Sequence, residues 1–299
     1  MIKNFTQLVN QVRSSKNRRI SVAVAQDADV LEALQRAKKA NLADAILVGD
    51  HKKISRIALE NKLSIREFEV LDIKDEKKAV EVSIDLIRKG EADILMKGLC
   101  STATLMKAVL DRERGLRQTG LLSHLGIFEI QSYPKLILMS DAALNIVPTL
   151  DEKLKIIDNA VLVAKRLGIS KPKVAMITAV EKINPEKMPA TADAAIIAKM
   201  SERGQIKGAI IDGPLALDNA FSKKSCEIKG IHSEVGGVAD IAIVPNIEAG
   251  NVFYKLMSYL AGARTAGIIL GAKVPIVLTS RADSDETKFL SIATAAKVC

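Results

Sequence analysis

The sequence predicts an α/β protein with mainly parallel sheets, organised as two domains. Short apolar runs alternate with longer segments in which apolar residues recur at helical spacing, and strands that alternate with helices pair in parallel through right-handed crossovers. The chain has 299 residues, which suits two domains or one large one, and 48% of them are apolar, enough for substantial cores. Aromatic residues make up only 3%, so Ala, Ile, Leu and Val must fill these cores.

The first half of the chain reads as one strand–helix series. An amphipathic helix is expected within residues 1–19, and Asp27 is placed to cap the helix that follows the first strand. Thr149 and Glu152 predict a capping box for a long helix, and the best candidate domain boundary lies just before it. The expected strands are residues 20–25, 43–49, 68–73, 92–96, 121–128 and 135–139. Further helices are expected over residues 51–63, 77–89, 102–112 and 150–167.

A second series follows the long helix. Residues 209–215 read as a strand that breaks into an Asp-Gly-Pro turn, and residues 218–238 as a loop with a short helix. The remaining expected strands are residues 174–179, 239–245, 265–270 and 274–278, with helices over 191–202, 252–261 and 289–296.

Composition narrows the class of function. The net charge of +9 is typical of nucleic-acid-binding proteins, but base-stacking aromatic residues beside basic clusters are missing, so no nucleic-acid partner is expected. A positive balance equally suits a small polyanionic substrate. Three widely spaced cysteines, Cys100, Cys226 and Cys299, indicate neither a disulfide framework nor a cysteine metal site. No signal peptide or transmembrane run is seen, so a cytoplasmic protein without membrane contact is expected.

Polar residues collect where several expected strands end. Lys97-Gly-Leu-Cys-Ser-Thr-Ala103 joins a strand to a helix and could cradle a phosphate, because free helix N–H groups, hydroxyls and an ammonium favour an anion. An ordinary capped helix explains the same residues, and Cys100 reads as a small packed residue rather than a nucleophile. The segments 140–149, 211–219 and 246–251 are similar polar strand ends, where functional groups often gather.

The segment Leu278-Thr-Ser-Arg-Ala-Asp-Ser-Asp-Glu286 is the strongest candidate for the chemistry. It lies between a buried strand and the last helix, and open α/β sheets bind ligands at such places. Its serines and acids also suit a helix start. Arg281 favours a functional role, because a cation beside a helix N-terminus opposes the dipole. A metal site at Asp283, Asp285 and Glu286 is less economical than acids in a first helical turn, so no metal is expected. His124 is expected to be a satisfied sheet histidine rather than a general base.

Five segments occurring in one order resemble the phosphate acetyl- and butyryltransferase family, and the likeness covers about residues 20–299. The segments are Met96-Lys-Gly-Leu-Cys-Ser-Thr-Ala103, Asp141-Ala-Ala-Leu-Asn-Ile-Val-Pro148, Ile211-Asp-Gly-Pro-Leu215, Pro245-Asn-Ile-Glu-Ala-Gly-Asn-Val252 and Thr279-Ser-Arg-Ala-Asp-Ser284. The chain length, the Met-Lys-Gly start and the Ser-Arg-Ala-Asp-Ser ending look closer to the butyryl branch.

The resemblance implies a fold and a reaction. The fold would be the two-domain α/β fold of isocitrate and isopropylmalate dehydrogenases, with residues 1–142 plus 282–299 as the first domain and 143–281 as an inserted second domain. The reaction would turn acyl-CoA and phosphate into acyl phosphate and CoA at a cleft between domains, without a covalent acyl-enzyme. The expected partners are these small molecules and a second copy in a homodimer or a multiple of dimers. Coenzyme A would be a substrate, and no permanently bound cofactor is expected. A metal- and NAD-dependent dehydrogenase of the same fold is the rival enzyme.

The resemblance also implies site residues. Ser280 and Arg281 match the acetyl branch's pair that holds the acyl phosphate, so Ser280, Arg281 and Asp283 are the candidate catalytic residues. The acetyl branch places its catalytic Asp where this chain has Thr287, so the base would be Asp283, Asp285 or Glu286, with Asp283 preferred. An Arg of the acetyl branch is replaced here near Met106 or Lys107. The candidate substrate-binding residues are Lys97, Gly98, Ser101, Thr102, Lys107, Asp141, Asn145, Asp212, Gly213, Pro214, Asn246, Gly250 and Asn251.

Overall fold

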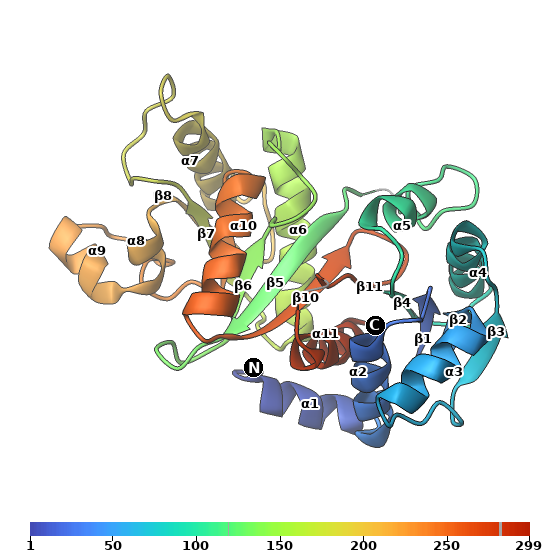
Figure 1. Ribbon diagram of the computed structural model, residues 1–299. Coiled ribbons are helices and arrows are strands. Elements are labelled where there is room, and N and C mark those ends of the chain that lie inside the picture. The colour runs from blue at the N-terminus through green and yellow to red at the C-terminus, as the bar shows by residue number, and fades with distance from the viewer. Residues whose placement is uncertain (119, 281–282) are drawn as a thin grey trace. The chain divides into compact units, whose positions relative to one another are not determined.

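A computed structural model describes residues 1–118, 120–280 and 283–299 of the chain (Figure 1). The chain packs as two compact units, Phe5–Gly120 with Thr265–Cys299, and Met1–Asn4 with Leu121–Arg264. We call them the outer unit and the middle unit, after their places in the sequence. The boundaries between the units lie at residues 120/121 and 264/265. The domain boundaries predicted from the sequence lie at residues 142/143 and 281/282. That division stays a prediction.

The outer unit is a mainly parallel sheet covered by helices. Its strands run in the order β3-β2-β1-β4-β11-β10, with only β10 and β11 antiparallel among the pairs in this unit that the structure describes. The chain moves outward from β1 to β3 and then returns to β4 on the other side of β1. Its strands are β1 (Arg18–Ala23), β2 (Ala43–Gly49), β3 (Glu69–Asp72), β4 (Ile94–Lys97), β10 (Arg264–Leu270) and β11 (Ile276–Val277). Its helices are α1 (Phe5–Arg13), α2 (Ala28–Lys39), α3 (His51–Glu60), α4 (Glu76–Arg88), α5 (Thr102–Val109) and α11 (Asp285–Val298).

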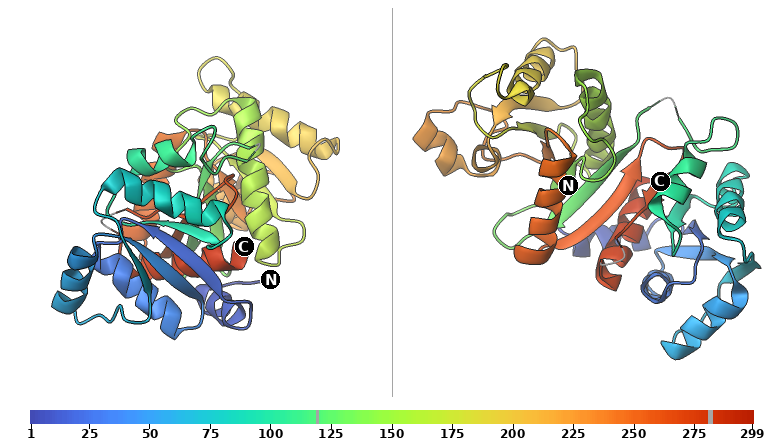
Figure 2. Two further views of the ribbon diagram at one scale, coloured as in Figure 1. Left: turned by 90° about the vertical axis from the view of Figure 1, so that its right-hand side faces the viewer. Right: turned by 45° about the horizontal axis from the view of Figure 1, so that its top comes forward.

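The strands of the middle unit follow one another in the order β5-β6-β9-β7-β8, in which β5 is antiparallel to β6 and the other neighbours are parallel. Helix α10 packs over β5 and β6 (Figure 2). There, Phe128 and Met139 pack with Phe253, Tyr254 and Met257. The strands are β5 (Ser123–Glu129), β6 (Ile137–Ser140), β7 (Lys173–Ile177), β8 (Ile210–Leu215) and β9 (Ile241–Ile243). The helices are α6 (Leu150–Arg166), α7 (Pro189–Glu202), α8 (Leu217–Phe221), α9 (Lys223–Lys229) and α10 (Ile247–Lys255), and α10 continues as the π-helix Leu256–Leu260.

The α/β prediction is confirmed, and so are two predicted helix starts. Asp27 caps α2 by accepting a hydrogen bond from the Val30 N–H at 3.0 Å. Thr149 and Glu152 form the predicted capping box of α6. The helix start at the C-terminal segment is also confirmed, since Ser284 caps α11 and two acids occupy its first turn. Helix α11 packs against α2 and α1 of its own unit (Figure 1).

The prediction of an Asp-Gly-Pro turn after residue 211 is wrong. Asp212, Gly213 and Pro214 lie inside β8, and the ladder continues to Leu215, whose carbonyl accepts from the Thr178 N–H at 3.0 Å. Proline has no N–H to donate, but β8 is the last strand in the order of its sheet, so the missing donor does not break an inner ladder. The loop predicted over residues 218–238 contains two short helices, α8 and α9.

No helix in the described part of the chain is both long and apolar enough to span a membrane.

Candidate active site

In the outer unit, two parallel strands carry candidate residues to one edge of the sheet. Strands β4 and β11 are neighbours, with Leu95 opposite Ile276 and Met96 opposite Val277. The segment after Lys97 and the segment leading to Ser280 therefore leave the sheet from the same edge. In open α/β sheets, this carboxyl edge is where ligands bind. The structure thus brings together two of the segments that the sequence predicted as functional.

The turn after β4 requires glycine. The Gly98 N–H donates to the Ala23 carbonyl at 2.9 Å, and the Leu99 N–H donates to the Val24 carbonyl at 2.7 Å. A Cβ at position 98 would lie 2.1 Å from the Val24 oxygen, so no larger residue fits without moving the backbone. The Lys97 side chain is buried and its Nζ donates to the Gly98 carbonyl at 3.1 Å. The ammonium is therefore held at the strand end.

Helix α5 begins directly after this turn. Ser101 caps it by accepting from the Thr104 N–H at 2.9 Å, and Thr102 and Lys107 are exposed. Cys100 is completely buried, and burial raises its pKa to about 11, although Lys97 opposes the shift. Cys100 is thus a packed residue, as the sequence predicted, with a thiol that stays protonated at neutral pH.

Before α11, Ser280 and Asp283 are joined by two hydrogen bonds. The Asp283 carboxylate accepts a hydrogen bond from the Ser280 N–H at 2.7 Å, and the Asp283 N–H donates to the Ser280 carbonyl at 3.2 Å. Asp283 is buried and Ser280 is exposed. Arg281, the third candidate catalytic residue, lies outside the described residues. Ser280 is therefore exposed, whereas the carboxylate that accepts from its N–H is buried.

The two other candidate bases have a partner that sequence reasoning missed. Arg36 of α2 pairs with Asp285 and with Glu286, the latter at 2.6 Å. Burial lowers the Arg36 pKa, but the hydrogen bonds and charges of Glu286 and Asp285 outweigh it and leave that pKa raised. Arg36 precedes Asp285 by 249 positions, so no local pattern could reveal this pair. Asp285 and Glu286 therefore join α11 to α2.

In the middle unit, Asp141 organises the loop after β6. Its buried carboxylate accepts from the N–H groups of Ala143 and Leu144 at 2.8 and 3.0 Å, and from the His124 N–H at 3.1 Å. The Asn145 side-chain amide adds a fourth hydrogen bond at 2.6 Å and also donates to the Leu122 carbonyl. Asp141 and Asn145 thus fix the loop.

Helix α10 starts against the same loop, because β9 lies beside β6 in parallel. Asn246 caps the helix through the Ala249 N–H at 2.9 Å, and the Asn251 amide donates to the Ala142 carbonyl at 3.3 Å. A Cβ on Gly250 would lie 2.2 Å from the Asp141 carbonyl oxygen. Asn246, Gly250 and Asn251 are therefore gathered around residues 141–145.

Asp212, Gly213 and Pro214 lie apart from that group. Strands β9 and β7 separate β8 from β6, so three strand spacings amount to roughly 14 Å. The Asp212 carboxylate accepts from the adjacent Gly213 N–H at 2.8 Å. Their mid-strand position differs from the strand end that the sequence predicted.

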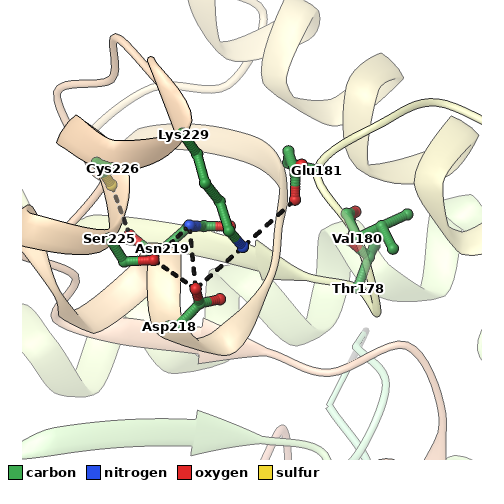
Figure 3. A network of polar contacts seen from close by, with 8 residues as sticks. All are labelled: Thr178, Val180, Glu181, Asp218, Asn219, Ser225, Cys226 and Lys229. Carbon is green, nitrogen blue, oxygen red and sulfur yellow. Dashed lines mark hydrogen bonds and ion pairs between the residues drawn. The ribbon is translucent and has the colours of Figure 1, made fainter.

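A network of polar contacts joins the segments that come after β7 and β8 in the chain (Figure 3). Lys229 lies between Asp218 and Glu181, at 3.0 and 3.7 Å, and donates to the buried Asn219 at 3.3 Å. The Ser225 hydroxyl donates to Asp218, and together with Lys229 it lowers the Asp218 pKa. These contacts hold α9 to α8 and to the segment after β7. The sequence predicted a loop with a short helix over residues 218–238 and did not reveal these contacts.

His124 is buried in the sheet, as predicted, but it is not fully satisfied. Its Nδ1 has no hydrogen-bond partner among the described residues. Burial lowers the His124 pKa, and the Asp141 charge only partly opposes this shift. The ring contacts Tyr254 edge-on at 5.5 Å between centroids. His124 is therefore a neutral, packed side chain at pH 7.

Within residues 1–118, 120–280 and 283–299, no three His, Cys, Asp or Glu side chains are grouped so that they could hold a metal ion. The polar groups at the two sheet edges are hydroxyls, amides, single carboxylates and an ammonium. Such groups suit an anionic organic substrate and a proton transfer.

Comparison with known proteins decides the family. The model of the phosphate acetyl/butaryl transferase family matches residues 4–86 and 77–296. The chain belongs to this family.

Individual members of the phosphate acetyl/butaryl transferase family match along the whole chain. The phosphate butyryltransferase of Clostridium acetobutylicum is 50% identical over 298 residues, covering 100% of this chain and 99% of that protein. The phosphate acetyltransferase of Thermotoga maritima is 44% identical over 292 residues, covering 98% and 99%.

Solved structures of other proteins are similar to this chain in fold. A branched-chain phosphotransacylase from Enterococcus faecalis V583 is 33% identical with a TM-score of 0.83, covering 94% of this chain and 99% of that chain. A 4-hydroxythreonine-4-phosphate dehydrogenase from Klebsiella pneumoniae is 13% identical with a TM-score of 0.57, covering 94% and 99%. The latter similarity concerns the fold alone, and it fits the predicted relation to dehydrogenase folds.

Proposed function

We propose that this member of the family is a phosphate butyryltransferase-type enzyme. It moves a short-chain acyl group reversibly between coenzyme A and inorganic phosphate. The full-length similarity to a phosphate butyryltransferase carries the proposal. The polar edge formed by β4 and β11 supports it, because an ammonium, hydroxyls and a carboxylate lie there.

The proposed chemistry is direct attack in a ternary complex. The coenzyme A thiol resembles a cysteine thiol, whose pKa is about 8.5 in water. It loses its proton to a carboxylate base. The thiolate sulfur then bonds to the acyl carbonyl carbon, and the carbon–oxygen bond to phosphate breaks, so that phosphate leaves with the electron pair. Asp283 is the proposed base, since Asp285 and Glu286 are engaged with Arg36.

The tetrahedral intermediate needs donors for its oxyanion, and Ser280 and Arg281 are proposed for this role. Loss of one such donor raises the barrier by about 3–4 kcal/mol in other enzymes. We expect Arg281→Ala to lower turnover at least a hundredfold with the fold intact. Thiol release measured with a thiol-reactive dye, together with far-UV circular dichroism, checks this. Near-normal turnover would remove Arg281 from the chemistry.

The leaving phosphate is proposed to bind at the turn between β4 and α5. Lys97 and Lys107 supply positive charge, while Ser101, Thr102 and the free N–H groups at the start of α5 supply donors. Gly98 lets the turn approach β1 closely. Alanine at Ser101 would remove the cap as well as the hydroxyl, so Thr102→Val is the cleaner test of phosphate affinity.

The middle-unit candidates are proposed to have two different roles. Asp141, Asn145 and Gly250 already have structural contacts, so we propose that they hold the loop. Asn246 and Asn251 are proposed to contact substrate beside it. The same role is proposed, on the family resemblance, for Asp212, Gly213 and Pro214.

The second candidate is acetyl transfer, favoured by the similarity to a phosphate acetyltransferase. Acetyl-, butyryl- and branched acyl-CoA, each assayed with phosphate for thiol release, separate the two. Highest kcat/KM with butyryl-CoA supports the proposal, and highest kcat/KM with acetyl-CoA contradicts it.

We further propose that the enzyme needs no resident cofactor, acts in the cytoplasm and forms a homodimer or a multiple of dimers. Sedimentation equilibrium of the purified protein tests the assembly, and a monomer would contradict it.

A further inference from the structure

Lys288 of α11 is a charged side chain that the fold buries almost completely. The residue is 2% exposed, although lysine is among the residues least often buried. It lies one turn after the N-cap Ser284, and its N–H donates to the Ser284 carbonyl at 3.1 Å. A cation at this end of a helix opposes the helix dipole, so both the burial and the place of Lys288 ask for an explanation.

An ion pair connects Lys288 with α2. Its ammonium lies 3.2 Å from the Asp29 carboxylate, and the Asp29 side chain is 51% exposed, so water weakens the pair. Taking an ammonium out of water is costly, and apolar residues in place of buried ion pairs often give equal or higher stability. The pair with Asp29 is therefore a weak reason to bury a lysine.

The same ammonium contacts the residue that is proposed as the base. Lys288 Nζ donates to the main-chain carbonyl of Asp283. Because the Cα–Cβ bonds of a helix tilt towards its N-terminus, a long side chain one turn into α11 can reach back past the helix start. Asp283 precedes the N-cap, so its carbonyl lies outside the intrahelical hydrogen bonds. Lys288 therefore supplies a donor that the helix backbone does not.

The other polar groups of Asp283 are bonded to Ser280. The carboxylate accepts from the Ser280 N–H at 2.7 Å, and the Asp283 N–H donates to the Ser280 carbonyl at 3.2 Å. Asp283 is thus held through its carbonyl by Lys288 and through its N–H and carboxylate by Ser280. A displacement of the Asp283 main chain would therefore move the proposed base and disturb its bonds to Ser280.

We propose that Lys288 is a positioning residue for the acyl transfer, whose ammonium fixes the Asp283 main chain and thereby the place of the Asp283 carboxylate beside Ser280. The inference rests on the proposed function and adds a residue behind its base. A hydrogen bond from a charged donor is stronger than one from a neutral donor, which suits it to hold a main chain. Lys288 does not bind phosphate itself, because its side chain is 3% exposed and its ammonium already bonds to Asp29 and Asp283.

Methionine at position 288 tests this role. Lys288→Met keeps an unbranched side chain and removes the ammonium. We expect kcat to fall about ten- to a hundredfold, because a small displacement of a catalytic group can cost that much. The KM values for acyl-CoA and for phosphate should stay within about threefold, since the role acts through Asp283. Steady-state thiol release gives all three values. Near-normal kcat, or a change confined to the KM for phosphate, overturns the proposal.

Folding of the variant is checked by far-UV circular dichroism and thermal melting. We expect Lys288→Met to fold, because an apolar side chain replaces a buried charge. Should it not fold, Lys288→Gln takes its place in every measurement with the same expected results, since its amide is uncharged and its side chain is one bond shorter.

Two matched controls change ion pairs between α2 and α11 without touching Asp283. Asp29→Asn removes the charge opposite Lys288 and leaves the bond from Lys288 to the Asp283 carbonyl. Arg36→Met removes the pairs of Arg36 with the two acids in the first turn of α11. Both variants should keep kcat within twofold, whatever their effect on the melting temperature. If Arg36→Met lowers kcat as much as Lys288→Met, Lys288 only joins the two helices, and the proposal fails.

Hydrogen exchange keeps this test apart from the proposed function. Mass spectrometry of a peptide spanning residues 278–284 follows the N–H groups of Ser280 and Asp283 without any turnover. We expect them to exchange about tenfold faster in Lys288→Met and at the parent rate in Arg36→Met. If the parent releases no thiol from acyl-CoA, the proposed function fails, while the exchange rates still show whether Lys288 holds Asp283. Equal exchange in the parent and in Lys288→Met overturns the inference.

Discussion

The Asp283 carboxylate accepts a hydrogen bond from the main-chain N–H of Ser280 at 2.7 Å. A second hydrogen bond, from the Asp283 N–H to the Ser280 carbonyl at 3.2 Å, closes the same turn. The residue proposed as the base therefore also sets the place of the residue proposed as an oxyanion donor. A change at Asp283 acts on both, and a test has to separate them.

Asparagine at position 283 separates these roles. Asp283→Asn keeps an oxygen that can accept from Ser280, but it cannot take a proton at neutral pH. If Asp283 is the base, we expect Asp283→Asn and Asp283→Ala to lower kcat by at least a hundredfold each, the usual range for lost acid–base catalysis. Steady-state thiol release measures this. Near-normal kcat in Asp283→Asn, with a large loss in Asp283→Ala, would leave Asp283 only a positioning role.

Glu286→Gln should affect stability rather than turnover. Its side chain pairs with Arg36 at 2.6 Å and is about one-third exposed, so water screens the pair. We expect a loss of about 0.5–1 kcal/mol in the free energy of unfolding in urea, with kcat within twofold. Arg36→Met removes the pairs with both Asp285 and Glu286 and should give a larger loss. A hundredfold fall in kcat for Glu286→Gln would make Glu286 the base instead.

Gly250→Ala should damage the loop that Asp141 holds. The added Cβ would lie 2.2 Å from the Asp141 carbonyl oxygen, so the helix or the loop has to move. We expect about 1–3 kcal/mol of lost stability in urea unfolding, together with weaker substrate binding. Gly120→Ala is the matched control, because no atom of the described, non-adjacent residues lies within 4 Å of its added Cβ. Equal stability of the two variants would mean that the close approach is unimportant.

His124 predicts a pH dependence of stability. Burial lowers its pKa in the folded protein below the ordinary 6.5, so the unfolded chain binds a proton more readily. Keeping His124 neutral therefore contributes to the free energy of unfolding. This contribution is complete above pH 6.5 and is lost as the pH falls below that value, by up to about 1.4 kcal/mol per pH unit. Urea unfolding at several pH values should show the decline, and His124→Asn should reduce its slope. An unchanged slope in His124→Asn would assign the decline to other groups.

The cysteines should differ in reactivity. Burial raises the Cys100 pKa to about 11 and also raises that of Cys226, whereas Cys299 is partly exposed. At pH 8, we expect iodoacetamide to label Cys299 first and Cys100 only after unfolding, because the thiolate is the reactive form. Peptide mapping by mass spectrometry locates the label. Fast labelling of Cys100 in the folded protein would contradict its burial.

Local patterns were enough to predict elements whose signals are contained in a few neighbouring residues. The capping box at Thr149 and Glu152 and the cap at Asp27 were found because each motif satisfies its own helix start. The segments around Lys97 and Ser280 were found because polar residues interrupt apolar runs. The turn expected at Asp212 failed for the same local reason, since Gly-Pro normally ends a strand and only the edge position of β8 tolerates it.

Long-range pairings could not be predicted. Arg36 meets Asp285 and Glu286 across about 250 positions, and Lys229 meets Glu181 through packing of separate segments. Neither contact leaves a periodic or spaced signal.

The sequence by itself determined the α/β class, the family resemblance and the polar segments that follow the strands, because these depend on residue type and local order. Only the tertiary structure decided which carboxylate is hydrogen-bonded to Ser280 and which carboxylates pair with Arg36. It also decided that Asp212 lies in an edge strand. The physical reason is that a side chain's role depends on the groups within a few ångströms of it. In this chain, α2 supplies Arg36 to Asp285 and Glu286 of α11, although the two helices are distant in sequence.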